Sequence, residues 1–141
     1  MMPNAANPRT DGIALLADLA ELGARVTEAM ATAVRNPEVL TNATTQILIL
    51  LRTHGPSRPS DLASHLGVSR PQITKLVGQL EEHELVERRH DVISDRRAVA
   101  VGLTVVGDRV LDAADQILEQ GFSNLSAVQD AVAEFLVRTG R

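Results

Sequence analysis

The stretch DRRAVAVGLT, residues 95–104, decides the fold, because it combines a charged turn with the return strand of a β-hairpin. Val99, Val101 and Leu103 alternate with small residues at the two-residue period of a half-buried strand. Thr104 follows, and a threonine at this point ends the strand and can cap the start of a helix. The arginines stand at the exposed end of the hairpin. The stretch therefore predicts a wing, a short basic hairpin beside a helical unit.

Two short helices separated by a glycine precede this hairpin. The first is expected over Asp61–Leu66, with Ser60 as its N-cap and Gly67 in its C-terminal turn. The second begins after Ser69, which stands three residues before Gln72 as in a capping box. Helix, glycine-containing turn and helix is the plan of a helix-turn-helix. With the hairpin, it predicts a winged helix-turn-helix and makes DNA the leading partner.

The rest of the chain is expected to be helical. Apolar residues at helical spacing predict a first helix over residues 10–35 and a second over about residues 44–53, whose lack of a polar face predicts burial. A long helix is expected over residues 104–120, and Ser126–Gln129 has the spacing of a capping box that opens the last helix. The predicted fold class is mainly α with a small β-wing, in a single domain of residues 1–141.

The first and last helices each carry an apolar face, although the winged unit of residues 40–104 separates them in the sequence. The economical way to bury both faces is against each other and against a second copy. Residues 10–35 and 105–139 are therefore expected to form a helical dimerisation region, and the protein is expected to be a homodimer.

Charge is distributed unevenly along the chain. The formal net charge is −4, yet residues 52–97 hold eight basic and seven acidic side chains. Thirteen of the fourteen basic residues are arginine, the side chain suited to bidentate contacts with phosphates and base edges. A nucleic-acid partner is thus compatible with the acidic total.

Several function classes are excluded or disfavoured. The chain has no cysteine, which excludes disulfides and thiolate zinc sites, and its four histidines follow no metal-ligand spacing. No catalytic arrangement of side chains is recognisable, so neither an enzyme, a cofactor nor a metal is expected. The amino terminus has no signal pattern and no apolar run can span a bilayer, so we expect a cytoplasmic protein without membrane contact.

Family-specific residues occur in order through the middle of the chain. In the wing they are Asp95, Arg97, Val101, Leu103, Thr104 and the following Gly107. In the helix-turn-helix they are Ser60-Asp61-Leu62-Ala63, Leu66-Gly67-Val68-Ser69, Leu76, Leu80, Leu85-Val86 and Arg88-Arg89. By these residues the chain resembles the multiple-antibiotic-resistance regulator (MarR) family over residues 40–107. The resemblance implies a homodimeric transcription factor, in most cases a repressor that a small ligand releases from a palindromic operator.

Two glycine positions depart from the simplest expectation. Glu84 stands where the family usually has the glycine that ends the second helix of the motif, and a non-glycine residue in a left-handed turn costs about 1 kcal/mol. Gly78 lies inside that helix, where glycine costs roughly 0.5–1 kcal/mol relative to alanine. Either it permits close approach to DNA or it is a tolerated residue, and base rates favour the second interpretation.

The resemblance implies that Arg97 enters the minor groove and that Asp95 braces it, while Arg96 either contacts a phosphate or is solvated. In the major groove, Thr74 and Lys75 are the first candidates for reading base edges. Gln72 is a further candidate for reading a base, although its side chain is also suited to closing the capping box on Ser69. Pro71, like the methyl group of Thr74, can contact a thymine methyl group. Side chains at the helix starts are placed for phosphates, although about half of them are equally well explained as caps; they are Ser57, Arg58, Ser60, Ser69 and Arg70.

The effector cannot be identified from the sequence. A pocket is expected between the winged unit and the dimer interface, lined by aliphatic residues such as Met30, Leu48 and Val110. The walls are expected to be aliphatic because the chain has two phenylalanines and no tryptophan or tyrosine for stacking, and the ligand-binding residues stay unknown. The alternative function class is a winged-helix protein-interaction module of the anti-repressor type, which keeps the fold but does not bind DNA itself.

Overall fold

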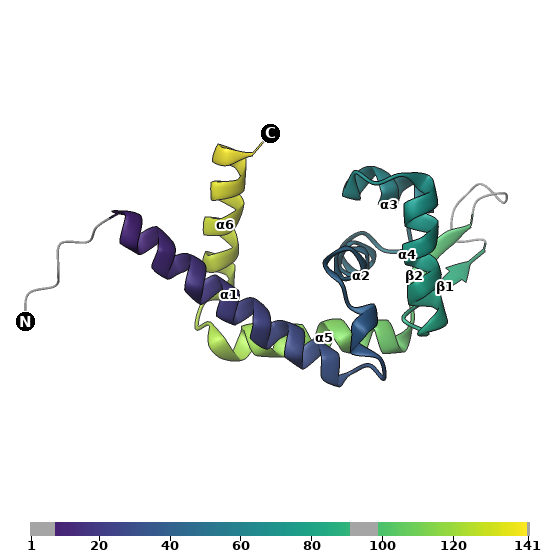
Figure 1. The fold of residues 1–141 in the computed structure, drawn as a ribbon, viewed down its shortest axis with the longest axis horizontal. Coiled ribbons are helices and arrows are strands. Elements are labelled where there is room, and N and C mark those ends of the chain that lie inside the picture. Colours follow the sequence, from purple (N-terminus) through teal and green to yellow (C-terminus); the bar gives the residue numbers. More distant parts are fainter. Residues whose placement is uncertain (1–7, 91–98, 141) are drawn as a thin grey trace, which may run out of the picture.

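A computed structural model describes residues 8–90 and 99–140. The chain is mostly helical with one two-stranded antiparallel sheet, which confirms the predicted fold class (Figure 1). In chain order the elements are α1 Pro8–Thr32, the 3-10 helix η1 Pro37–Val39, α2 Asn42–His54, α3 Pro59–Leu66, α4 Arg70–Glu82, β1 Val86–Arg89, β2 Ala100–Leu103, α5 Val105–Gly121 and α6 Leu125–Thr139.

Three of the helix starts are fixed by hydroxyl caps. The side chains of Thr41, Ser69 and Thr104 accept hydrogen bonds from the backbone N–H three residues further on, at the starts of α2, α4 and α5. Such caps satisfy amides that have no partner within the helix. The caps predicted at Ser69 and Thr104 are therefore confirmed, and they fix where α4 leaves the turn and where α5 leaves the sheet.

Two predicted caps are wrong. α3 begins at Pro59 with Arg58 as its N-cap, so Ser60 lies inside the first turn. Proline suits the first helical position because its φ is preset and its missing N–H would have no partner there. α6 begins at Leu125, and Asn124 rather than Ser126 supplies the cap, by accepting the Ala127 amide at 3.0 Å.

α2 is the central helix of the winged unit, with α3, α4, β2 and α5 packed around it. Its buried residues Thr44, Ile47, Leu48 and Leu51 lie on one side, whereas Ile49 is 45% exposed. The predicted burial beneath the other elements is therefore confirmed for one side of the helix, but not for the side that carries Ile49. Hydrophobicity along a segment does not show which apolar residues lack a neighbour, and this depends on where the other helices lie.

α1 and α5 form the long base of the molecule and pack against each other, but the N-terminal part of α1 runs away from α5, and residues 11–20 are exposed (Figure 1). α6 turns away from α5 and stands off from the winged unit. α1 ends at Thr32, slightly earlier than predicted, because the chain must become extended at Asn36 before Pro37. None of the helices in the described residues is both long and apolar enough to cross a bilayer.

Candidate nucleic-acid interface

The turn between α3 and α4 has the geometry of a helix-turn-helix. Gly67 adopts the left-handed conformation with φ of 67°, and the amide of Val68 donates to the carbonyl of Ala63 at 3.1 Å. A glycine in this conformation closes a helix without the steric cost of a side chain. The two helices then pack directly against each other, which fixes the direction in which α4 faces solvent.

α4 has one buried and one exposed face. Ile73, Val77 and Leu80 are at most 1% exposed and hold the helix against α2 and the sheet. Thr74 and Lys75 lie between these residues in the sequence, and their side chains are exposed on the opposite side of the helix. The surface that the sequence assigns to base reading is thus free for a partner, because it contributes nothing to the core.

The remaining candidates gather at the starts of α3 and α4. Ser69, Arg70, Pro71 and Gln72 are exposed in the cap and first turn of α4, and Ser60 is exposed in the first turn of α3. Arg58 is half-buried where it precedes α3. Backbone amides at such helix starts point outward and carry a partial positive charge, which suits a phosphate oxygen.

Two polar groups among the candidates already have partners. The Thr74 hydroxyl donates to the carbonyl oxygen of Arg70 at 2.9 Å, so its hydrogen is engaged within α4. The Ser69 hydroxyl accepts the Gln72 amide at 3.3 Å, which is one of the two hydrogen bonds of a capping box. This arrangement favours contact through the Thr74 methyl group and leaves Lys75 as the charged group on this face.

The base of the predicted wing is the sheet β1–β2, in which Val86 pairs with Leu103 and Arg89 with Ala100. β2 is also bonded on its other edge, where Ser57 and Val101 exchange backbone hydrogen bonds of 2.9 and 2.8 Å. Asp95, Arg96 and Arg97, to which the sequence assigns the wing contacts, lie outside the described residues.

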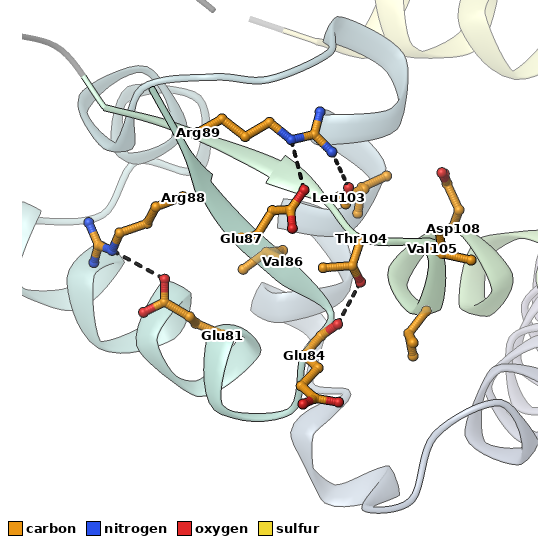
Figure 2. A pocket seen from close by; sticks show the side chains of 11 residues that line it. Glu81, Glu84, Val86, Glu87, Arg88, Arg89, Leu103, Thr104, Val105 and Asp108 are labelled. Atoms are coloured by element: carbon orange, nitrogen blue, oxygen red, sulfur yellow. Dashed lines mark hydrogen bonds and ion pairs between the residues drawn. The ribbon is translucent and has the colours of Figure 1, made fainter. Parts of the chain in front are cut away.

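Sequence reasoning missed the ion pairs at the wing base. Arg88 on β1 lies 3.2 Å from Glu81 on α4, and Arg89 lies 3.1 Å from Glu87 (Figure 2). Part of the positive charge counted in this segment is therefore balanced by neighbouring carboxylates. The Glu87–Arg89 spacing of two residues, which places both on one face of a strand, is the only sequence signal that could have indicated such a pair.

The turn from α4 into β1 is left-handed at Glu84, which has φ of 61°. The family glycine is absent, but the conformation that glycine would favour is kept. Close packing follows it: a Cβ atom at Gly107 in α5 would lie 2.2 Å from the carbonyl oxygen of Leu85. α4, the wing and α5 therefore meet at one tight junction.

A cavity of about 320 Å³ lies between α1, α2 and α5, and its lining includes Val26, Met30, Ile49 and Leu111. Leu48 and Val110, which we predicted to line such a pocket, are fully buried in the core instead. Of the three residues predicted, only Met30 lines the cavity.

Arg52 stands beside this cavity and links α2 to α5. Its guanidinium donates to Asp112 at 2.6 Å and to the Asp108 carbonyl at 3.1 Å. The hydrogen bond to the Asp112 carboxylate raises the pKa of Arg52 above its usual range, although burial acts in the opposite direction. The cavity thus has a mainly apolar lining, with the ion-paired Arg52 and the acidic residue Asp115 at its edge.

A second apolar concavity, about 520 Å³, lies where α1, α5 and α6 meet. Leu19, Leu118, Phe122 and Leu136 are among its lining residues. Further along the same helices, Ile13 and Phe135 are 67% and 61% exposed. The helices at the two ends of the chain therefore leave much of their apolar surface uncovered within one protomer.

Two of the four histidines lie close together. The rings of His54 and His65 meet edge to face, with centroids 5.4 Å apart. Over residues 8–90 and 99–140, no three side chains of the metal-binding types are grouped so that they can hold an ion.

The sequence comparisons point to one family. The sequence model of the MarR family matches residues 40–99. The "uncharacterized HTH-type transcriptional regulator YfiV" of Bacillus subtilis (strain 168) is 41% identical over 59 residues, which are 42% of this chain and 36% of that protein. The match therefore spans about a third of the length of this relative.

Structural similarity extends over nearly the whole chain. The crystal structure of RV1404 from Mycobacterium tuberculosis aligns with a TM-score of 0.72 and 21% identity, and covers 100% of both chains. YusO from Bacillus subtilis aligns with a TM-score of 0.62 and 22% identity, over 98% of this chain and 100% of its own. The S. aureus MepR–DNA complex aligns with a TM-score of 0.60 and 19% identity, over 88% of this chain and 94% of its own. At these identities the structures show a shared fold.

Proposed function

The chain carries a MarR-family winged helix-turn-helix, and from this premise we propose that it is a transcription regulator that binds double-stranded DNA. The observation that carries the proposal is the division of α4 into a buried apolar face and an exposed face with Thr74 and Lys75. A helix placed in this way after a helix-turn-helix turn enters the major groove with its N-terminal residues foremost. The DNA complex of the structurally similar MepR is consistent with this role.

In the proposed complex, Lys75 donates to guanine and the Thr74 methyl group contacts a thymine methyl. Pro71 and Gln72 lie beside them in the first turn of α4. Phosphate contacts come from Arg58, Ser60, Ser69 and Arg70, at the starts of α3 and α4. In the wing, Arg97 enters the minor groove with Asp95 as its brace, and Arg96 faces the backbone.

We further propose that the regulator is a homodimer on a palindromic operator. The exposed apolar side chains of α1 and α6 support this assembly, since Ile13, Leu16, Phe135 and Leu136 are each at least 59% exposed. A second copy that covers these faces relates the two α4 helices by a twofold axis. Half-sites about one turn of DNA apart, roughly 34 Å, then follow from the symmetry.

The cavity between α1, α2 and α5 supports a ligand-responsive repressor. It lies where the helices of the proposed dimer interface meet the winged unit, and Met30 and Arg52 both line it. A ligand that binds better when α1 and α5 are displaced from α2 shifts the spacing of the two α4 helices and releases the operator. An apolar molecule matches this lining, because the Arg52 guanidinium is already paired with Asp112.

The proposal is tested by selecting duplexes from a random pool with the wild-type protein and measuring affinity by fluorescence anisotropy. Arg97→Ala is expected to weaken binding at least tenfold, because a guanidinium in a narrow groove faces concentrated negative potential. Arg141→Ala removes the same charge outside the predicted wing segment of the sequence and serves as the control. Equal effects of the two changes would show that the wing is not used. A wild-type protein that enriches no duplex would favour the protein-interaction module instead.

A further inference from the structure

Arg89 lies across the outer face of the two-stranded sheet, over Gly102 of β2 (Figure 2). A Cβ atom at Gly102 would lie 2.6 Å from both Cζ and Nε of the Arg89 side chain. The missing side chain is therefore what allows the Arg89 side chain to lie against the strand at this point. Glycine weakens a strand interior, and a common reason for its presence is the close approach of another group.

Two hydrogen bonds hold the Arg89 side chain in this position. Nε donates to the carboxylate of Glu87 at 3.1 Å, and Nη2 donates to the carbonyl oxygen of Leu103 at 2.5 Å. The first bond stays within β1 and the second crosses to β2. Arg89 is thus bonded to both strands, at a side-chain exposure of 34%.

Arg88 has a different role. Its guanidinium lies 3.2 Å from Glu81, so it connects β1 to α4 and leaves the pairing of the strands unaffected. A two-stranded hairpin is marginally stable on its own, and cross-strand side-chain contacts contribute much of what holds it. Of the two ion-paired arginines of β1, Arg89 is the one whose side chain stiffens the pairing of β1 with β2.

We infer that Arg89 is a positioning residue that braces the base of the wing and so supports DNA binding without contacting DNA. The inference rests on the proposed DNA-binding function. Its basis is that the Nε and Nη2 groups of the guanidinium already donate to Glu87 and to the Leu103 carbonyl, and that Gly102 provides the space. The opposite interpretation is that Arg89 is a phosphate ligand.

The brace can be removed from either side. Arg89→Ala deletes the guanidinium, whereas Gly102→Ala displaces it and leaves every charge in place. Both variants are expected to speed amide hydrogen exchange in β1 and β2 and to weaken DNA binding by about two- to fivefold, the range of a cross-strand contact. The slope of log affinity against log salt should stay unchanged in both. A slope reduced by about one unit in Arg89→Ala alone would identify a phosphate contact and overturn the inference.

Glu87→Gln separates the two interpretations by whether it weakens or strengthens DNA binding. It changes the structure less than Gly102→Ala, so it remains informative if Gly102→Ala fails to fold. As a brace, Arg89 loses the charge of its partner, which weakens the hydrogen bond, so DNA binding should weaken relative to Glu82→Gln, which makes the same charge change on an exposed residue of α4. As a phosphate ligand, Arg89 is set free, and binding should tighten beyond that of the control. Tighter binding overturns the inference while the DNA-binding function stands, whereas a wild-type protein without DNA affinity removes both.

Discussion

Thr104 donates its hydroxyl to the carbonyl oxygen of Glu84 over 2.5 Å, which joins the end of α4 to the start of α5. The same hydroxyl oxygen accepts the amide of Gly107 at 3.1 Å, and the Thr104 amide donates to Leu85 at 3.1 Å. One residue therefore caps α5 and fixes the left-handed turn that leads from α4 into the wing. In the proposed regulator, this junction connects the helix that reads DNA with a helix of the dimer interface.

Glu84→Gly is expected to stabilise the fold by about 1 kcal/mol, because glycine adopts a positive φ without the clash of a Cβ atom. Glu84→Ala is the matched control, since it removes the carboxylate and keeps the Cβ atom. Urea denaturation measures both. A stabilisation of equal size in the two variants would attribute the gain to charge instead of backbone conformation.

Gly107→Ala is expected to destabilise the protein by about 2–3 kcal/mol, the cost of forcing atoms into a closely packed junction. The new Cβ would lie 2.2 Å from the Leu85 carbonyl oxygen, and a backbone group does not move aside easily. Gly78→Ala provides the contrast, because a Cβ at that helical position has no atom within 4 Å. We expect Gly78→Ala to raise the free energy of unfolding by roughly 0.5–1 kcal/mol. Thermal melts that rank the two variants the other way would contradict the packing argument.

Lys75→Ala is expected to relax base preference at a cost of about 1–3 kcal/mol, since this exposed side chain is placed to read base edges. Arg70→Ala should weaken binding to all duplexes alike and reduce the salt slope by about one unit, because the residue lies at the start of α4 where phosphates bind. A salt titration on the selected duplex and on a scrambled one separates the two effects. If Lys75→Ala changed only the slope and Arg70→Ala changed the preference, the two assignments would be exchanged.

Charged substitutions at Phe135 and Leu136 should dissociate the proposed homodimer and abolish DNA binding together. These side chains are 61% and 59% exposed on α6, so their replacement leaves the fold of one protomer largely intact. Burying two charges in an apolar interface costs far more free energy than placing them on a solvent-exposed surface. Sedimentation of the wild-type and variant proteins at micromolar concentration measures the change. A wild-type protein that sediments as a monomer would refute the assembly.

Local patterns in the sequence were sufficient for the element types and for most of their boundaries. Apolar residues at helical spacing placed α1 and α2, and the alternation at Val101 and Leu103 placed β2, although all four residues of β2 are buried and the strand is not half-buried as predicted. These patterns work because a helix or strand must turn its apolar side to the core. Caps at Ser69 and Thr104 were equally readable, because a hydroxyl reaches an amide only three residues away.

The sequence by itself determined the winged helix-turn-helix, the exposed face of α4 and the family resemblance, since all three depend on residues close together in the chain. Only the tertiary structure decided that Leu48 and Val110 belong to the core instead of a pocket, that Thr104 closes the turn at Glu84, and that Arg89 lies over Gly102. Each of these depends on which distant segments approach one another. Such an approach is set by the summed packing of whole helices and strands, which no local pattern contains.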